Sequence, residues 1–242
     1  MLHCDARRRN EYYRCVRRRP AARACDDEIP RYLALAGLIG PPLFASIIVL
    51  LTAIEWDFLH DLGWSAGPFD QPDSPAAWPS TTALGAYGFL QVLNFLVLGV
   101  SVLALAAALF RLFEARWTLG PSLLVLLAAG FATSAFRTDH GTATGAGPET
   151  WNGVTHAAAL TVVFPTAVAS MFVLAAQFRR DERWHSLSRY SLIAAVVTVA
   201  SLTATLAGAG NIFFSVFLLV VFSWLSVIAA HALSLTRLPR LS

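Results

Sequence analysis

The hydrophobic positions of this chain are gathered into six long runs that are separated by shorter polar segments. Each run is about 20 residues long, which is the length of helix that crosses a hydrocarbon core of about 30 Å. Main-chain amides find no water inside lipid, so each run is predicted to be a helix. The predicted spans are Tyr32–Ile54, Leu84–Phe110, Thr118–Phe136, Val154–Phe178, Tyr190–Ala207 and Ile212–Leu235.

These runs predict an all-α polytopic membrane protein, a bundle of six transmembrane helices over residues 32–236. Residues 1–31, which carry nine arginines among acidic residues, are expected to form a disordered cytoplasmic tail, and residues 237–242 a cytoplasmic C-terminus. The tail arginines could hold anionic lipid headgroups. Alternatively they only fix the orientation of the chain, or the tail is partly an over-extended start of translation.

The first loop between spans, Glu55–Ala83, differs in composition from the other loops. It contains four prolines and three tryptophans, together with several glycines and aspartates. Its aromatic side chains would be exposed in a free linker, so the loop is predicted to form an ordered cap over the outer face of the bundle.

The distribution of arginine predicts the orientation of the chain. All 18 basic residues are arginines, and only Arg137 falls on one side of the predicted spans. The positive-inside rule therefore places both termini in the cytoplasm, and we expect the protein in a bacterial plasma membrane with lipids as its partners. The isoelectric point near 9.0 could indicate nucleic acid, but the arginines lie in short clusters between apolar runs, so no nucleic-acid partner is expected.

Composition supports the membrane interpretation and excludes several classes of enzyme. Of 242 residues, 56% are hydrophobic and 14% are charged. The three cysteines precede the first span and are too far apart for a C-x-x-C pair, so no metal site and no cofactor are expected. The chain has no Walker loop, H-E-x-x-H or G-x-S-x-G motif, which argues against an ATP-driven pump, a zincin and an ordinary serine hydrolase.

Polar residues within or beside the spans are the candidates for function, because burying them in lipid is unfavourable. Gln91 and Asn94 share one face of the second span, where they either hydrogen-bond between helices or form the wall of a pocket. Asn152 and His156 lie four residues apart and are predicted to point the same way. A lone histidine there is more often a packing or interface residue than a ligand.

An arginine and an aspartate follow the third span. They are predicted to lie at the same depth in the membrane as the polar residues of the second and fourth spans. Arg137 and Asp139 are expected to pair with each other or to face a water-filled cavity. We hypothesise that the polar groups near the outer interface converge on one pocket beneath the loop that contains Trp78. Its members would be Gln91, Asn94, Arg137, Asp139, Asn152 and His156.

Several short motifs occur in an order and spacing that resemble a known family. They are G-L-I-G-P-P-L-F in the first span, W-P-S before A-Y-G-F-L-Q-V-L-N-F, F-R-T-D after the third span, T-W-N-G-V-T-H at the start of the fourth, and F-R-R-D-E-R-W before Y-S-L. Together they resemble the six-span bacterial membrane proteins, frequent in actinobacteria, that are catalogued as domain of unknown function 998. The resemblance runs from about Leu35 to Leu235 and implies fold and location but no activity.

Two positions depart from the family pattern that the resemblance implies. His140 stands where F-x-T-D is usually followed by proline, and Asn152 stands where a histidine often precedes the glycine of the fourth span. An amide is a poor ligand for transition metals, so the second departure weakens a two-histidine metal site. The favoured function is binding of a lipid or small amphiphile in a polar outer cleft. The alternatives are an intramembrane lipid-modifying enzyme that uses Asp139 and His156, and a small transporter.

Overall fold

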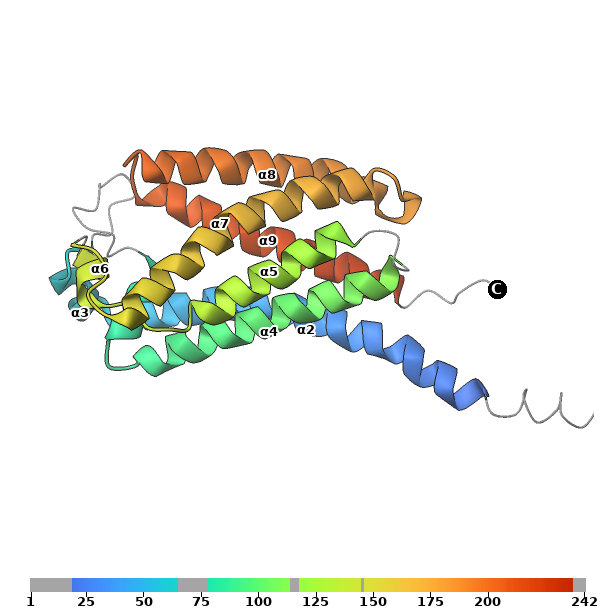
Figure 1. The fold of residues 1–242 in the computed structure, drawn as a ribbon, viewed down its shortest axis with the longest axis horizontal. Coiled ribbons are helices and arrows are strands. Elements are labelled where there is room, and N and C mark those ends of the chain that lie inside the picture. Colours follow the sequence, from blue (N-terminus) through green and yellow to red (C-terminus); the bar gives the residue numbers. More distant parts are fainter. Residues whose placement is uncertain (1–18, 65–77, 114–117, 145, 237–242) are drawn as a thin grey trace, which may run out of the picture.

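The computed structural model describes residues 19–64, 78–113, 118–144 and 146–236, and all regular secondary structure within these ranges is helical (Figure 1). The predicted all-α class is therefore confirmed. The principal helices are α2 (Arg19–Ile54), α4 (Gly88–Leu112), α5 (Leu119–Thr133), α7 (Trp151–Phe178), α8 (His185–Leu206) and α9 (Asn211–Leu235). The short ones are α3 (Trp56–Asp61), η3 (Pro79–Leu84), α6 (His140–Thr144) and η4 (Glu182–Trp184).

The principal helices form a closed ring in which each packs against the next along the chain. The order is α2, α4, α5, α7, α8 and α9, and α9 packs back against α2. The helices run alternately up and down, so α3 and α6 lie at one end of the bundle, whereas α2 begins and α9 ends at the other (Figure 1). We call these the capped end and the terminal end.

Five helices are long and apolar enough to cross a membrane. They cover Glu28–Ile54, Gly88–Leu112, Trp151–Phe178, Glu182–Leu206 and Asn211–Leu235. The remaining predicted span corresponds to α5, which has 15 residues and is therefore about 22 Å long. α5 packs between α4 and α7 in the ring, but a sixth crossing stays a prediction.

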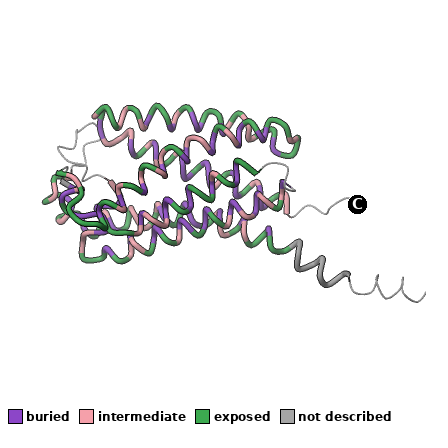
Figure 2. The backbone as a smooth tube through the Cα atoms, in the orientation of Figure 1, coloured by how far each residue is buried: buried purple, intermediate pink, exposed green. Residues whose placement is uncertain are grey.

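The outward faces of the helices are exposed (Figure 2), and they carry many large apolar side chains. Phe89 is 65% exposed, Val100 66% and Leu219 67%. Extended apolar surface of this kind is unfavourable in water and favourable in lipid. Together with the five long apolar helices, it indicates a multipass membrane protein.

Small residues bring neighbouring helices into close contact. A methyl group added at Gly40 of α2 would collide with the Ser101 side chain of α4. A methyl group added at Gly99 of α4 would lie 2.9 Å from the carbonyl oxygen of Ala128 in α5. Such contacts are typical of membrane bundles, where association depends on close packing rather than on exclusion of water.

The N-terminal part of the chain differs from its predicted organisation. α2 begins at Arg19, so residues 19–31, which were assigned to a disordered tail, continue the first helix, and residues 1–18 lie outside the described residues. Arginine and alanine favour helix, and a helix can extend past the bilayer into water. The predicted cap is helical at both flanks, in α3 and η3, whereas residues 65–77 lie outside the described residues.

Candidate functional site

The capped end of the bundle is covered by η3, which lies across the ring of helices. Trp78 precedes this element, and its ring stacks on Phe214 of α9 at a centroid distance of 4.9 Å. The same ring meets Phe164 of α7 edge-on at 5.8 Å. Arg137 also holds η3, because its Nε donates a 2.9 Å hydrogen bond to the carbonyl oxygen of Ala83. η3 is thus held by α7, by α9 and by the segment that follows α5.

Asp139 organises the connection between α5 and α7. Its Oδ1 accepts hydrogen bonds from the Thr142 backbone N–H at 2.9 Å and from the Thr142 hydroxyl at 2.7 Å. Its Oδ2 accepts from the backbone N–H groups of Glu149 at 2.7 Å and Thr150 at 2.8 Å, and from the Thr150 hydroxyl at 3.2 Å. A methyl group added at Gly153 would collide with this carboxylate. The Asp139 carboxylate therefore acts as a structural cap at the start of α7.

These contacts determine the ionisation of Asp139. Burial by itself raises the pKa of the carboxyl group, but the hydrogen bonds from Thr142, Thr150 and Glu149 outweigh burial and hold the pKa well below its usual range. The carboxylate is charged at neutral pH, and both of its oxygens are occupied by loop donors. Of the two expectations for Arg137 and Asp139, pairing with each other is not observed, because Arg137 bonds η3 while nearby main-chain N–H groups bond the carboxylate.

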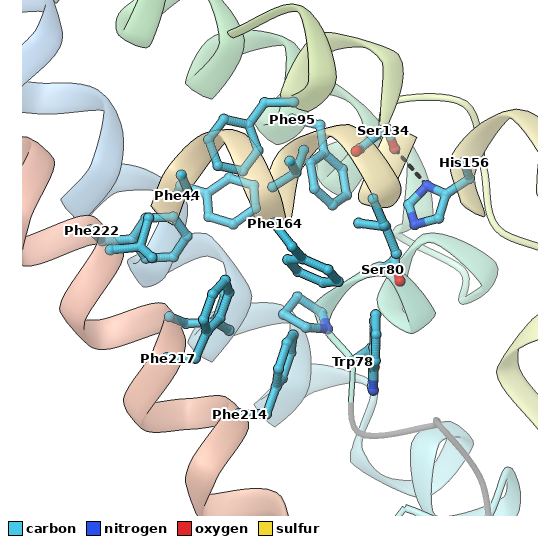
Figure 3. A pocket seen from close by; sticks show the side chains of 17 residues that line it. Phe44, Trp78, Ser80, Phe95, Ser134, His156, Phe164, Phe214, Phe217 and Phe222 are labelled. Carbon is cyan, nitrogen blue, oxygen red and sulfur yellow. Dashed lines mark hydrogen bonds between the residues drawn. The ribbon is translucent and has the colours of Figure 1, made fainter. Parts of the chain in front are cut away.

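His156 lies one turn into α7 and is 1% exposed. Its Nδ1 lies 2.9 Å from the carbonyl oxygens of both Ser134 and Phe136, which follow the end of α5 (Figure 3). The ring also meets Phe95 of α4 edge-on at 5.9 Å. The other ring nitrogen, Nε2, is buried and has no hydrogen-bond partner among the described residues.

Gln91 and Asn94 form a buried polar pair between α2 and α4. Asn94 Nδ2 donates to the Phe44 carbonyl oxygen at 3.1 Å and to Gln91 Oε1 at 3.2 Å. Phe44 lies in α2, two residues after Pro42. Pro41 and Pro42 have no N–H groups, so the main-chain hydrogen bonding of α2 is interrupted near this point. The pair therefore connects two helices, which agrees with the interhelical hydrogen bonding favoured for these residues.

Two cavities adjoin beneath η3, and they share Trp78, Ser80, His156 and Leu160. The first has a volume of about 50 Å³ and lies among aromatic side chains from α2, α4, α5, α7 and α9 (Figure 3). Its aromatic lining consists of Phe44, Trp78, Phe95, Phe131, Phe164, Phe214, Phe217 and Phe222. The second has a volume of about 330 Å³ and includes hydroxyl-bearing residues, namely Ser80, Thr81, Thr138 and Thr142.

The structure brings only part of the predicted pocket together. Trp78 and His156 border both cavities, but the other members of the set do not line either one. Asn152 is exposed, whereas His156, one turn further along α7, is buried. The residues outside the cavities are Gln91, Asn94, Arg137, Asp139 and Asn152.

Sequence reasoning missed Ser80 and most of the aromatic lining. Ser80 lies in the W-P-S motif and is buried, yet a serine in a loop carries no chemical signal by itself. The phenylalanines are spread over several spans, where aromatic residues also serve as ordinary core. Only the packing of the helices shows that these phenylalanines line one cavity.

The comparisons with known proteins agree with the sequence motifs. The profile of a family described as "Protein of unknown function (DUF998)" matches residues 68–231, which begin after α2 and extend into α9. No curated protein matches the chain, and no solved structure matches it. The matched region contains η3, His156 and the polar loop around Asp139. The resemblance is confirmed, and the chain belongs to the family of proteins of unknown function DUF998.

Proposed function

We propose that this protein binds a lipid or a small amphiphile at the capped end of its helix bundle. The observation that carries the proposal is the pair of adjoining cavities, one aromatic and one containing hydroxyl groups, that share Trp78 and His156. An amphiphile places an apolar segment beside a polar group, as the two cavities do. Binding sites for small molecules combine an apolar lining with a few placed polar groups in this way.

The volumes limit what the site can hold. The cavity with the hydroxyl groups, about 330 Å³, is at the lower end of the volumes typical of small-molecule sites. The aromatic cavity, about 50 Å³, accommodates a short apolar segment before the surrounding phenylalanines must move. A long hydrocarbon chain would therefore leave the bundle between helices and continue into the surrounding lipid.

We further propose that the capped end faces away from the cytoplasm in a bacterial plasma membrane. The ring places the start of α2, the α7–α8 connection and the end of α9 at the terminal end (Figure 1). Arg179, Arg180 and Arg183 belong to this end, whereas the capped end carries the acidic residues Asp57, Asp61 and Glu149. This distribution supports cytoplasmic termini under the positive-inside rule.

The alternative of an intramembrane enzyme gains less support from the geometry. It required Asp139 and His156 to act together as acid and base or as metal ligands. Both oxygens of Asp139 are bonded to loop donors, and Nδ1 of His156 is bonded to main-chain carbonyl oxygens. No hydrogen bond joins the two side chains within the described ranges. No specific observation favours the transporter alternative.

Photochemical crosslinking tests the proposed function. A long-chain fatty alcohol that carries a diazirine near its hydroxyl group is added to the full-length protein in mild detergent, and the labelled residues are mapped after irradiation. We expect labelling of Trp78, Ser80 and Leu160 that excess unlabelled alcohol suppresses. Labelling confined to lipid-facing residues such as Phe89 and Leu93 would contradict the proposal, because it would show only solvation by the detergent and alcohol.

A further inference from the structure

The hydrogen bonds of His156 fix which of its ring nitrogens carries the proton. Carbonyl oxygens accept hydrogen bonds and cannot donate them, so Nδ1, which lies between the carbonyl groups of Ser134 and Phe136, must be the donor. The imidazole ring is thereby held by the segment that follows α5. Nδ1 and Nε2 are separated by one ring carbon and their in-plane bonding directions diverge, so with Nδ1 on these carbonyl groups the lone pair of Nε2 faces away from them.

Nε2 of His156 is a hydrogen-bond acceptor with no partner in the part of the chain that the structure describes. The ring is 1% exposed and its hydrogen bonds within the described ranges go only to neutral carbonyl groups, so a positive charge there would be buried without an anion bonded to the ring. The neutral ring with a proton on Nδ1 leaves a lone pair on Nε2. His156 borders both cavities, and in Figure 3 the nitrogen opposite the Ser134 bond lies on the side of Ser80. An unsatisfied acceptor in such a place is unfavourable until a donor occupies the cavity.

The lining of the cavities defines the charge of the ligand. No arginine, aspartate or glutamate from the described ranges lines either cavity. A phosphate or carboxylate bound there would lose its water without gaining a cation, which is strongly unfavourable. The hydroxyl-bearing side chains Ser80 and Thr138 can donate to or accept from a neutral polar group. The described surroundings thus fit an uncharged ligand.

We propose that the ligand is a neutral hydroxylated amphiphile whose hydroxyl group donates a hydrogen bond to Nε2 of His156. The inference rests on the proposed function and adds the chemical class of the ligand and the atom that recognises it. Trp78 and the phenylalanines of the first cavity would contact the carbons next to the hydroxyl-bearing head. Anionic lipids with the same hydrocarbon chain should bind more weakly, because no cationic side chain lines either cavity among the described residues.

Three lipids with the same oleoyl chain test the inference. Monoolein carries free glycerol hydroxyl groups, methyl oleate has an ester but no donor, and oleoyl lysophosphatidic acid adds a negative charge. Native mass spectrometry of the full-length protein gives the dissociation constant for each lipid. We expect monoolein to bind about tenfold more tightly than methyl oleate, the ratio given by one buried hydrogen bond, and lysophosphatidic acid to bind most weakly.

A matched pair of variants tests whether the preference for monoolein over methyl oleate depends on Nε2 of His156. His156→Asn retains an N–H group at the position of Nδ1, so the bonds to Ser134 and Phe136 can persist while the Nε2 acceptor is lost. We expect the preference for monoolein over methyl oleate to fall to about one. His231→Asn, at the terminal end, should retain the preference of the unmodified protein.

The outcomes separate the inference from the function on which it rests. Equal binding of monoolein and methyl oleate, tightest binding of lysophosphatidic acid, or an unchanged preference in His156→Asn would overturn the neutral hydroxyl ligand while leaving amphiphile binding in place. Failure of all three lipids to bind would overturn the proposed function and this inference together. A cavity that holds only water would produce this last result.

Discussion

Replacement of Asp139 by asparagine perturbs the polar connection between α5 and α7 with almost no change in volume. The carboxylate accepts two hydrogen bonds at Oδ1, both from Thr142, and three at Oδ2, from Glu149 and Thr150. An asparagine side chain offers one oxygen and one NH₂ group. Whichever way the amide is turned, its NH₂ group faces at least one backbone N–H donor, so at least one bond is lost outright and the others no longer go to a charged acceptor.

The number and kind of hydrogen bonds to Asp139 give the expected loss of unfolding free energy in Asp139→Asn. A hydrogen bond to a charged group contributes about 1.5–3 kcal/mol. Asp139 is 8% exposed, so water replaces part of the lost bonding, and we expect the free energy of unfolding to fall by about 3 kcal/mol. For a chain of this length that corresponds to a decrease of roughly 6–12 °C in the midpoint of thermal unfolding.

Thermal unfolding in one detergent, measured across a range of pH, checks this prediction. Because hydrogen bonds hold the pKa of Asp139 below its usual range, the carboxylate stabilises the fold fully above about pH 4 and loses that effect as the pH falls further. The midpoints of the two proteins should therefore converge below about pH 4. The control Glu149→Gln changes an exposed side chain and should shift stability by less than about 0.5 kcal/mol. A midpoint for Asp139→Asn within about 2 °C of the unmodified protein at pH 7 would refute the reasoning.

Three further predictions concern packing and orientation. Gly153→Ala places a methyl group against the adjacent carboxylate and should lower the unfolding free energy by about 1–3 kcal/mol, measured by thermal unfolding; an unchanged midpoint would contradict it. Ser191→Ala removes the acceptor of the 3.0 Å bond from Trp224 Nε1 and should cost about 1–3 kcal/mol in the same assay, unlike alanine at the exposed Ser186. In a background without native cysteines, a cysteine at Glu149 should react with an impermeant thiol reagent in intact cells, and one at Ser186 only after lysis; the reverse pattern would overturn the proposed orientation.

The long helices were predictable because a bilayer imposes one requirement on every residue of a span. An apolar run of sufficient length has little alternative to helix in lipid, so the runs in α4, α7 and α9 identified these helices. The start of α2 was not predictable in this way. Charged residues beyond the apolar run remain free to be helical or irregular, and hydropathy does not distinguish between the two.

The partners of the predicted pocket residues were not predictable, because sequence spacing does not show which donors reach a side chain. Arg137 and Asp139 are close in sequence and opposite in charge, which favoured a pair. In the fold, main-chain N–H groups of Glu149 and Thr150 reach the carboxylate, and no composition rule identifies a backbone donor. His156 was identified as a candidate, but its anchor consists of carbonyl groups that every residue possesses.

The central claim is that an amphiphile occupies the two adjoining cavities, and native mass spectrometry of the protein purified in mild detergent tests it most directly. Leu160 borders both cavities, whereas Val173 is equally half-buried on the same helix but borders neither. We predict a copurifying amphiphile on the unmodified protein and on Val173→Trp, and its loss from Leu160→Trp, in which the indole ring fills the shared space. An unmodified protein without a bound amphiphile, or equal occupancy in Leu160→Trp, would contradict the account.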